Sequence, residues 1–147
     1  MRDACRWPPA GIRGVGFSRA NLFGKNFNNY CQEAQAPLLV TMVENIKAVD
    51  ELDTILQVDG QDAVLIGPYD LSASMGITAQ FDHPEFLSVI ELIRVQADKY
   101  KVPCGMHIVS PSQEKLTQLI GEGYRLIAYA IDATFLNAVV SKPNVDT

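Results

Sequence analysis

The sequence is poor in the features that mark membrane, secreted and nucleic-acid-binding proteins. No apolar run approaches the ~20 residues of a membrane span, and the amino terminus lacks the apolar stretch of a signal peptide. Lysine and arginine total 12 against 17 aspartates and glutamates, so the net charge of −5 offers no basic field to a phosphate backbone. We therefore expect a cytoplasmic protein that binds small molecules or other proteins, and neither nucleic acid nor membrane.

Cysteine is also scarce. Cys5, Cys31 and Cys104 lie far apart, with neither the spacing of metal ligands nor the even count of a disulfide framework. Free and mostly buried thiols are the expected outcome. The sequence is rich, by contrast, in apolar residues, which make up 48% of 147 positions and suffice for the core of one domain.

From residue 37 onward, short β-rich runs alternate with longer amphipathic segments, a pattern typical of consecutive βα units and a parallel sheet. The runs do not alternate polar with apolar residues, which predicts strands covered on both faces. A frayed tail is expected at 142–147, leaving 37–141 as the βα region. The four predicted strands span residues 37–43, 63–66, 102–106 and 125–130.

The segments between the runs carry helix signals. One helix is predicted near 46–57, a second near 84–99 with Asp82 as N-cap, and a short last one at 132–140. A further helix should begin at the Ser110 cap, with Leu116, Leu119 and Ile120 facing inward. Residues 1–36 form a separate lead-in: a Pro- and Gly-rich ordered loop at 7–16, then a helix over 21–35 broken near Gly24.

Each apolar run is followed by an ionisable residue: Glu44, Asp70, His107 and Asp132. The intervals between them are long enough for one helical crossover each, so all four should lie at the carboxyl edge of the sheet, where parallel α/β enzymes carry their chemistry. Two carboxylates on adjacent strands make an oxygen site suited to Mg²⁺ or Mn²⁺. Such a site keeps open positions for water and substrate oxygens, as a Lewis-acid catalyst requires.

Structural alternatives exist for all four residues. Glu44 could simply interact with a helix macrodipole, and Asp70 could cap the 71–74 turn, although we favour the metal interpretation for both. His107 is better explained by packing or hydrogen bonding than by metal ligation. Asp132 is better explained as a helix cap.

Several motifs resemble one known family. Residues 66–76 resemble the Gly-Pro-x-Asp-Leu-Ser signature of the HpcH/HpaI aldolases, also called 2,4-dihydroxyhept-2-ene-1,7-dioic acid or 2-dehydro-3-deoxyglucarate aldolases. Residues 8–16 with 18–20 resemble the Pro-Pro-x-Gly-x-Arg-Gly loop of that family, and Val43 with Glu44 resembles its metal-binding strand end. The agreement runs in order from about residue 7 to 140.

The resemblance implies a partial (βα)8 TIM barrel of the phosphoenolpyruvate/pyruvate superfamily, with about four carboxyl-terminal βα units. It implies a class II aldolase that cleaves a 4-hydroxy-2-oxo acid to pyruvate and an aldehyde, uses Mg²⁺, Mn²⁺ or Co²⁺, and forms homo-oligomers. Glu44 and Asp70 correspond to the metal ligands, and the backbone N–H of Tyr69 to a contact with the pyruvate carboxylate. Ser18 and Arg19 correspond to a loop near the same pocket.

The sequence departs from this family in two respects. Met42 stands where the family usually has a glutamine. The general base and the keto-acid-binding arginine of the family come from its first strands, and no residue here corresponds to them, so we expect a truncated chain holding the metal half of the site. The alternative is a non-catalytic half-barrel that binds metal or 2-oxo acid or self-associates, since open sheet edges favour association.

Overall fold

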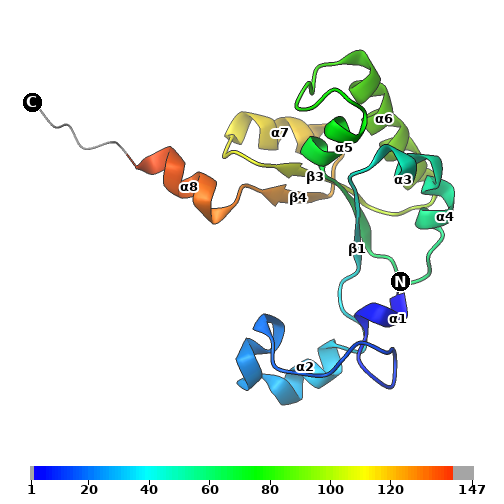
Figure 1. Cartoon of the computed structure of the whole chain (residues 1–147), viewed down its shortest axis with the longest axis vertical. Helices are drawn as coiled ribbons and strands as arrows, with labels where there is room; N and C mark the ends of the chain where they lie inside the picture. Colours follow the sequence, from blue (N-terminus) through cyan, green and yellow to red (C-terminus); the bar gives the residue numbers. More distant parts are fainter. Residues whose placement is uncertain (1, 141–147) are drawn as a thin grey trace, which may run out of the picture.

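The computed structural model describes residues 2–140, and its centre is a four-stranded parallel sheet (Figure 1). The strands β1 to β4 lie side by side in chain order, the arrangement expected of consecutive βα units. All four predicted strands are confirmed, with ends that differ by up to three residues. Their bounds are Val40–Val43 (β1), Ala63–Ile66 (β2), Cys104–Ile108 (β3) and Leu126–Tyr129 (β4).

Six helices alternate with the strands. The predicted 84–99 helix is confirmed at both ends, whereas the predicted 46–57 helix is split at Glu51, whose φ of −98° and ψ of 11° interrupt the helical geometry. The six helices are α3 (Ile46–Asp50), α4 (Leu52–Leu56), α5 (Pro68–Ser74), α6 (Pro84–Lys99), α7 (Gln113–Gly121) and α8 (Asp132–Val139).

The helices cover one face of the sheet only, which corrects the expectation of strands covered on both faces. Figure 1 shows α3 to α7 on one side of the strands and α8 extending away from them. Val43, Val64 and Ile66 point into this layer and are fully buried with Leu71 and Ile93. The strands lack polar alternation because side chains on the other face of the sheet are mostly apolar too. That face is not covered by any segment within residues 2–140.

Two predicted caps were wrong by one or two positions. His83, not Asp82, caps α6, because its Nδ1 accepts a hydrogen bond from the Glu85 N–H at 3.3 Å. Ser112, not Ser110, caps α7, because its hydroxyl accepts from the Lys115 N–H.

The buried face of α7 is narrower than predicted. Leu119 is buried as predicted and Leu116 is partly buried against the core. Ile120, predicted to face inward, is 53% exposed.

The amino-terminal segment (residues 2–36) has its own small cluster of Trp7, Tyr30 and Ala34. The predicted break near Gly24 is confirmed, since a 3₁₀ helix η1 (Arg19–Gly24) ends there and α2 (Phe27–Glu33) follows. A short α1 (Arg2–Cys5) was not predicted. In the part of the chain that the structure describes, no helix is long and apolar enough to cross a membrane. The tail predicted at 142–147 lies outside the described residues.

Candidate metal site at the carboxyl edge of the sheet

The site is built where β1 and β2 end together. Val43 pairs with Ile66 in the parallel register, so Glu44 and Gly67 are the next residues on neighbouring strands. The Gly67 N–H donates to the Val43 carbonyl at 3.1 Å, which fixes the two strand ends to each other. A Cβ at Gly67 would lie 3.2 Å from the Glu44 Cβ and 3.4 Å from the Met42 sulfur, so a larger residue here would have to displace one of these side chains by a few tenths of an ångström.

Asp70 follows three residues later, in the first turn of α5. Gly67 is the N-cap and Pro68 the first residue of this helix, so Asp70 is not the cap that the structural alternative required. The backbone N–H groups of Tyr69 and Asp70 lie in the same turn and have no acceptor within residues 2–140. The turn therefore presents a carboxylate and two free N–H donors.

A serine hydroxyl joins the helices behind the two carboxylates. The Ile46 N–H at the start of α3 donates to Ser74 Oγ at 2.9 Å, and that hydroxyl donates to the Leu71 carbonyl at 2.7 Å. Asn45 caps α3 by accepting from the Lys47 N–H at 3.0 Å. The segment after Glu44 is thus attached to the helix that carries Asp70.

The donor set suits a hard divalent cation. Glu44 and Asp70 are both exposed, and neither makes an ion pair or hydrogen bond with any other described residue. Carboxylate oxygens are the ligands that cations such as Mg²⁺ and Mn²⁺ prefer. No group of three or more His, Cys, Asp or Glu residues within residues 2–140 could hold a metal, so those residues offer at most a two-residue site here.

The other two strand-end candidates lie elsewhere. His107 is inside β3, opposite Ala128, rather than beyond the strand end. Asp132 is the first residue of α8, and its Oδ1 accepts from the Ala133 N–H at 2.8 Å. Ile131 occupies the N-cap position, so Asp132 is a first-turn carboxylate and not the cap that was predicted.

Tyr69 borders an aromatic cavity beside the site. Tyr69 is 46% exposed, and its ring packs edge-to-face on Phe81, with the ring centroids 5.0 Å apart. Tyr69 and His107 both line a cavity of about 480 Å³ between α6 and α7. An apolar part of a ligand could enter this cavity.

Ser18 and Arg19 are not brought to the carboxylates within one chain. They lie at the start of η1, which packs on α2, and Figure 1 shows α2 beyond the amino end of β1 whereas Glu44 follows the carboxyl end. The loop itself is well ordered: fully buried Asn21 accepts from the Ser18 N–H at 2.8 Å and donates to the Gly16 carbonyl at 2.7 Å.

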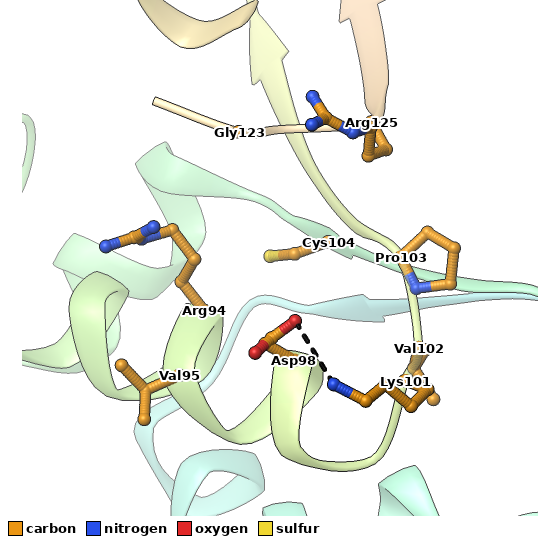
Figure 2. Close-up of a pocket in the computed structure, with 9 residues that line it drawn as sticks. All are labelled: Arg94, Val95, Asp98, Lys101, Val102, Pro103, Cys104, Gly123 and Arg125. Carbon is orange, nitrogen blue, oxygen red and sulfur yellow. Dashed lines mark ion pairs between the residues drawn. The ribbon is translucent and has the colours of Figure 1, made fainter. Parts of the chain in front are cut away.

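A second cavity, of about 510 Å³, lies at the opposite, amino end of β3 and β4 (Figure 2). Its cations are Arg94, Lys101 and Arg125, and Lys101 pairs with Asp98 at 3.8 Å. These cations lie near the carboxyl ends of α6 and α7, where positive charge complements the helix macrodipole. Burial raises the pKa of the Cys104 thiol on the cavity floor to about 11, so the thiol is protonated at neutral pH.

Gly67, Ser74 and Asn45 shape the site without carrying its charge, and their roles were not predicted from sequence. Gly67 and Ser74 fall within the 66–76 motif, so the motif held a signal for them, but their contacts depend on the register of two strands.

Comparison with known proteins identifies the family of this chain. The profile of the HpcH/HpaI aldolase/citrate lyase family matches residues 1–138. A hydroxypyruvate/pyruvate aldolase of Roseobacter denitrificans is 39% identical over 137 residues, covering 90% of this chain and 52% of that protein. A 5-keto-4-deoxy-D-glucarate aldolase of Citrobacter koseri is 31% identical, covering 93% of this chain and 53% of that protein. The chain thus spans about half the length of these relatives.

Solved structures give the same result. A HpcH/HpaI aldolase/citrate lyase family protein of Burkholderia cenocepacia superposes with a TM-score of 0.74 at 31% identity, over 91% of this chain and 53% of that one. A HpcH/HpaI aldolase of Desulfitobacterium hafniense gives 0.73 at 28% identity, over 92% and 53%. The α/β fold with a parallel sheet is shared with these proteins, and the chain belongs to the HpcH/HpaI aldolase/citrate lyase family.

Proposed function

We propose that this chain is the metal-binding half of a class II aldolase that cleaves a 4-hydroxy-2-oxo acid to pyruvate and an aldehyde. Its four βα units correspond in this proposal to one half of a (βα)8 barrel. The observation that carries the proposal is the pair Glu44 and Asp70: two unpaired carboxylates beyond adjacent parallel strands whose ends are joined by the Gly67 N–H. The names of the two aldolase relatives support a 2-oxo acid as the substrate class.

Each residue of the site has a defined task in this proposal. Glu44 and Asp70 hold Mg²⁺, Mn²⁺ or Co²⁺, which when bound supplies positive charge next to the enolate that forms on carbon–carbon cleavage. The free N–H of Tyr69 donates to the substrate carboxylate, because it lies one residue from Asp70 in the same turn. Met42, beside Glu44 and Gly67, presents a thioether to the pocket in place of a polar side chain.

Binding without turnover is the behaviour we propose for the chain alone. Aldol cleavage requires a general base and a cation that holds the keto acid. His83 uses its Nδ1 to cap α6, and neither His83 nor His107 corresponds to the general base of the family. Those groups come from residues outside this chain in our proposal.

Ser18 and Arg19 can assist the pocket only from another copy of the chain. They lie at the end of β1 opposite to Glu44, so a homo-oligomer must bring them to a neighbouring site. This requirement agrees with the homo-oligomer expected from the family.

Calorimetric titration with Mn²⁺ tests the metal site. Glu44→Gln and Asp70→Asn should each weaken binding by more than the ~10- to 100-fold that loss of an outer-shell partner costs. Glu114→Gln and Asp132→Asn are matched controls, because both residues are exposed first-turn carboxylates of other helices, and they should leave the affinity unchanged. Equal affinity in wild type and Asp70→Asn would remove Asp70 from the site.

An assay of pyruvate release tests the division between binding and turnover. The chain with Mn²⁺ should release no pyruvate from a 4-hydroxy-2-oxo acid. Turnover that disappears in Glu44→Ala would show that this chain alone contains a complete site and would overturn that part of the proposal.

A further inference from the structure

The cavity of about 480 Å³ between α6 and α7 is formed by an internal stretch of the chain. All the residues that line it lie between positions 68 and 124. Phe86 comes from α6, Leu119 from α7 and Met106 from β3, so elements present in this chain surround the cavity. Its volume is within the range of about 300–1,000 Å³ that is typical of small-molecule sites.

Aromatic rings form one side of this cavity. Tyr69 packs on Phe81, and Phe81 packs on Phe86 with the ring centroids 5.6 Å apart. Phe86 and Leu119 are each 2% exposed, so the inner wall is apolar. Aromatic side chains favour edge-to-face and offset contacts with other rings, which suits this wall to a flat apolar molecule.

The Tyr124 side chain adds a polar group to the apolar cavity. Tyr124 is 4% exposed, and its hydroxyl makes no hydrogen bond with any residue that the structure describes. Gln61 Nε2 is the one side-chain nitrogen or oxygen of residues 2–140 that is fully enclosed without a partner, so the Tyr124 hydroxyl still has an opening. A smaller cavity of about 320 Å³ shares Ile90, Glu122 and Tyr124 with the first, and Tyr124 stands where the two meet.

A buried hydroxyl without a partner requires an explanation. Buried polar groups are almost always hydrogen-bonded, since an unsatisfied one costs about 1–3 kcal/mol. Burial raises the pKa of the Tyr124 hydroxyl to about 12, so the group is protonated and can donate a hydrogen bond at neutral pH. An acceptor atom inside the cavity would remove the cost.

The charges around the cavity indicate that its ligand is neutral. Two carboxylates, Asp82 and Glu122, line the cavity against the single ammonium group of Lys115. Gln118 links the last two, because it accepts from the Lys115 Nζ at 3.1 Å and donates to a Glu122 oxygen at 2.6 Å. An anionic ligand would therefore meet excess negative charge and no unoccupied cation.

We propose that the cavity between α6 and α7 is a binding site for a small neutral aromatic molecule whose oxygen accepts a hydrogen bond from the Tyr124 hydroxyl. The aromatic wall binds the ring of this ligand, and Tyr124 selects the polar end. The proposal rests on residues other than Glu44 and Asp70, so it stands apart from the metal site and from the function proposed above.

Titration of the full ¹⁵N-labelled chain with benzamide tests this site. Benzamide is neutral and carries one ring and a carbonyl oxygen. In the absence of any divalent cation, it should give saturable shifts of the amide signals of Met106, Leu119 and Tyr124. Shifts that do not saturate, or that leave these signals unchanged, would overturn the proposal and leave the hydroxyl to water alone.

A matched pair of tyrosine variants tests the hydrogen bond. Tyr124→Phe keeps the ring and removes the donor, so it should weaken benzamide binding by about 2- to 10-fold. Tyr100→Phe is the control, because the Tyr100 hydroxyl accepts from Gln57 at 3.4 Å outside this cavity, and it should leave the affinity unchanged. Equal affinities in the two variants would contradict the assigned role of Tyr124.

A change of probe tests the charge of the ligand. Benzoate has the shape of benzamide and a negative charge, so Asp82 and Glu122 should make it bind more weakly. Benzoate that binds as tightly as benzamide, or more tightly, would contradict the assignment of a neutral ligand.

Discussion

The sheet module (residues 40–129) and the amino-terminal segment are stabilised in different ways. The sheet module buries aliphatic side chains such as Ile66, Leu71 and Ile93 in one continuous cluster between strands and helices. The amino-terminal segment buries few residues and relies on aromatic stacking and on hydrogen bonds from side chains to the backbone. Arg13 lies over both Trp7 and Tyr30, with 5.7 Å from its guanidinium carbon to each ring centroid.

The difference explains why the two regions should respond differently to substitution. A close-packed aliphatic core joins many side chains in one cluster, so a change there alters the stability of the whole module. A loop held by a few directional contacts changes locally when one of them is lost. Substitutions in the sheet module should therefore cost more, and act over a wider region, than those in the amino-terminal segment.

Ile93→Ala should give the largest loss. Ile93 is fully buried in the centre of the sheet module, and such truncations cost about 3–4 kcal/mol through lost burial and the cavity that remains. Urea unfolding followed by circular dichroism measures the change. Leu92→Ala on the exposed side of the same helix should cost less than about 1 kcal/mol. Similar losses in the two variants would show that the core is not where the structure places it.

Asn21→Ala should have a smaller and local effect. The fully buried amide accepts from the Ser18 and Gly24 N–H groups and donates to the Gly16 carbonyl, and its removal leaves these groups without partners, at about 1–3 kcal/mol. Hydrogen exchange should accelerate across residues 16–24 while the amides of β2 and β3 keep their protection. Faster exchange in β2 would contradict the independence of the two regions.

Arg13→Met should weaken the amino-terminal segment by about 1 kcal/mol, because it removes the cation from two aromatic faces and the 2.8 Å hydrogen bond to the Tyr30 hydroxyl. Trp7 is the single tryptophan, so its fluorescence reports this segment alone. The fluorescence transition should shift and the far-UV transition of the sheet module should not. Lys25→Met, an exposed change in the same segment, serves as the control.

The rate of thiol labelling at pH 8 should differ between the two regions, although labelling conditions leave their stability unchanged. Cys5 and Cys31 of the amino-terminal segment are partly exposed, whereas burial raises the pKa of Cys104 to about 11 from 9.0. Iodoacetamide at pH 8 should therefore modify two thiols quickly and Cys104 slowly, since the thiolate is the reactive form. The stability that the buried thiol contributes is complete below pH 9 and is lost as pH rises through about 11. Equal labelling of all three at pH 8 would be inconsistent with this structure.

Much of the sheet module could be predicted from sequence because its elements are defined by apolar periodicity. The 84–99 helix and the 63–66 strand agree at both ends. Caps were harder to predict, since Ser110 and Ser112 are chemically identical and only the backbone conformation at 112 selects one. The uncovered face could not be foreseen, because continuous apolar runs are equally consistent with a cover from helices and a cover from other strands.

The two carboxylates of the candidate site could be predicted from sequence, but the contacts that position them could not. Glu44 and Asp70 follow apolar runs, so the sequence places them near one edge. Their relation depends on the register that sets Val43 opposite Ile66, which no local pattern encodes. Ser18 and Arg19 were predicted as pocket residues from the family resemblance alone. A family motif does not indicate whether a loop contributes to the site of its own chain or to that of another copy.

The Ser74 hydroxyl, which joins the start of α3 to the helix that carries Asp70, gives the site preorganisation. The backbone near the two carboxylates is held in place before any cation arrives, so little chain entropy is lost when one binds. Ser74→Ala should therefore leave the ligands themselves intact and yet raise the entropic cost of metal binding. This hydroxyl therefore affects the entropy of metal binding and does not change which residues bind the metal.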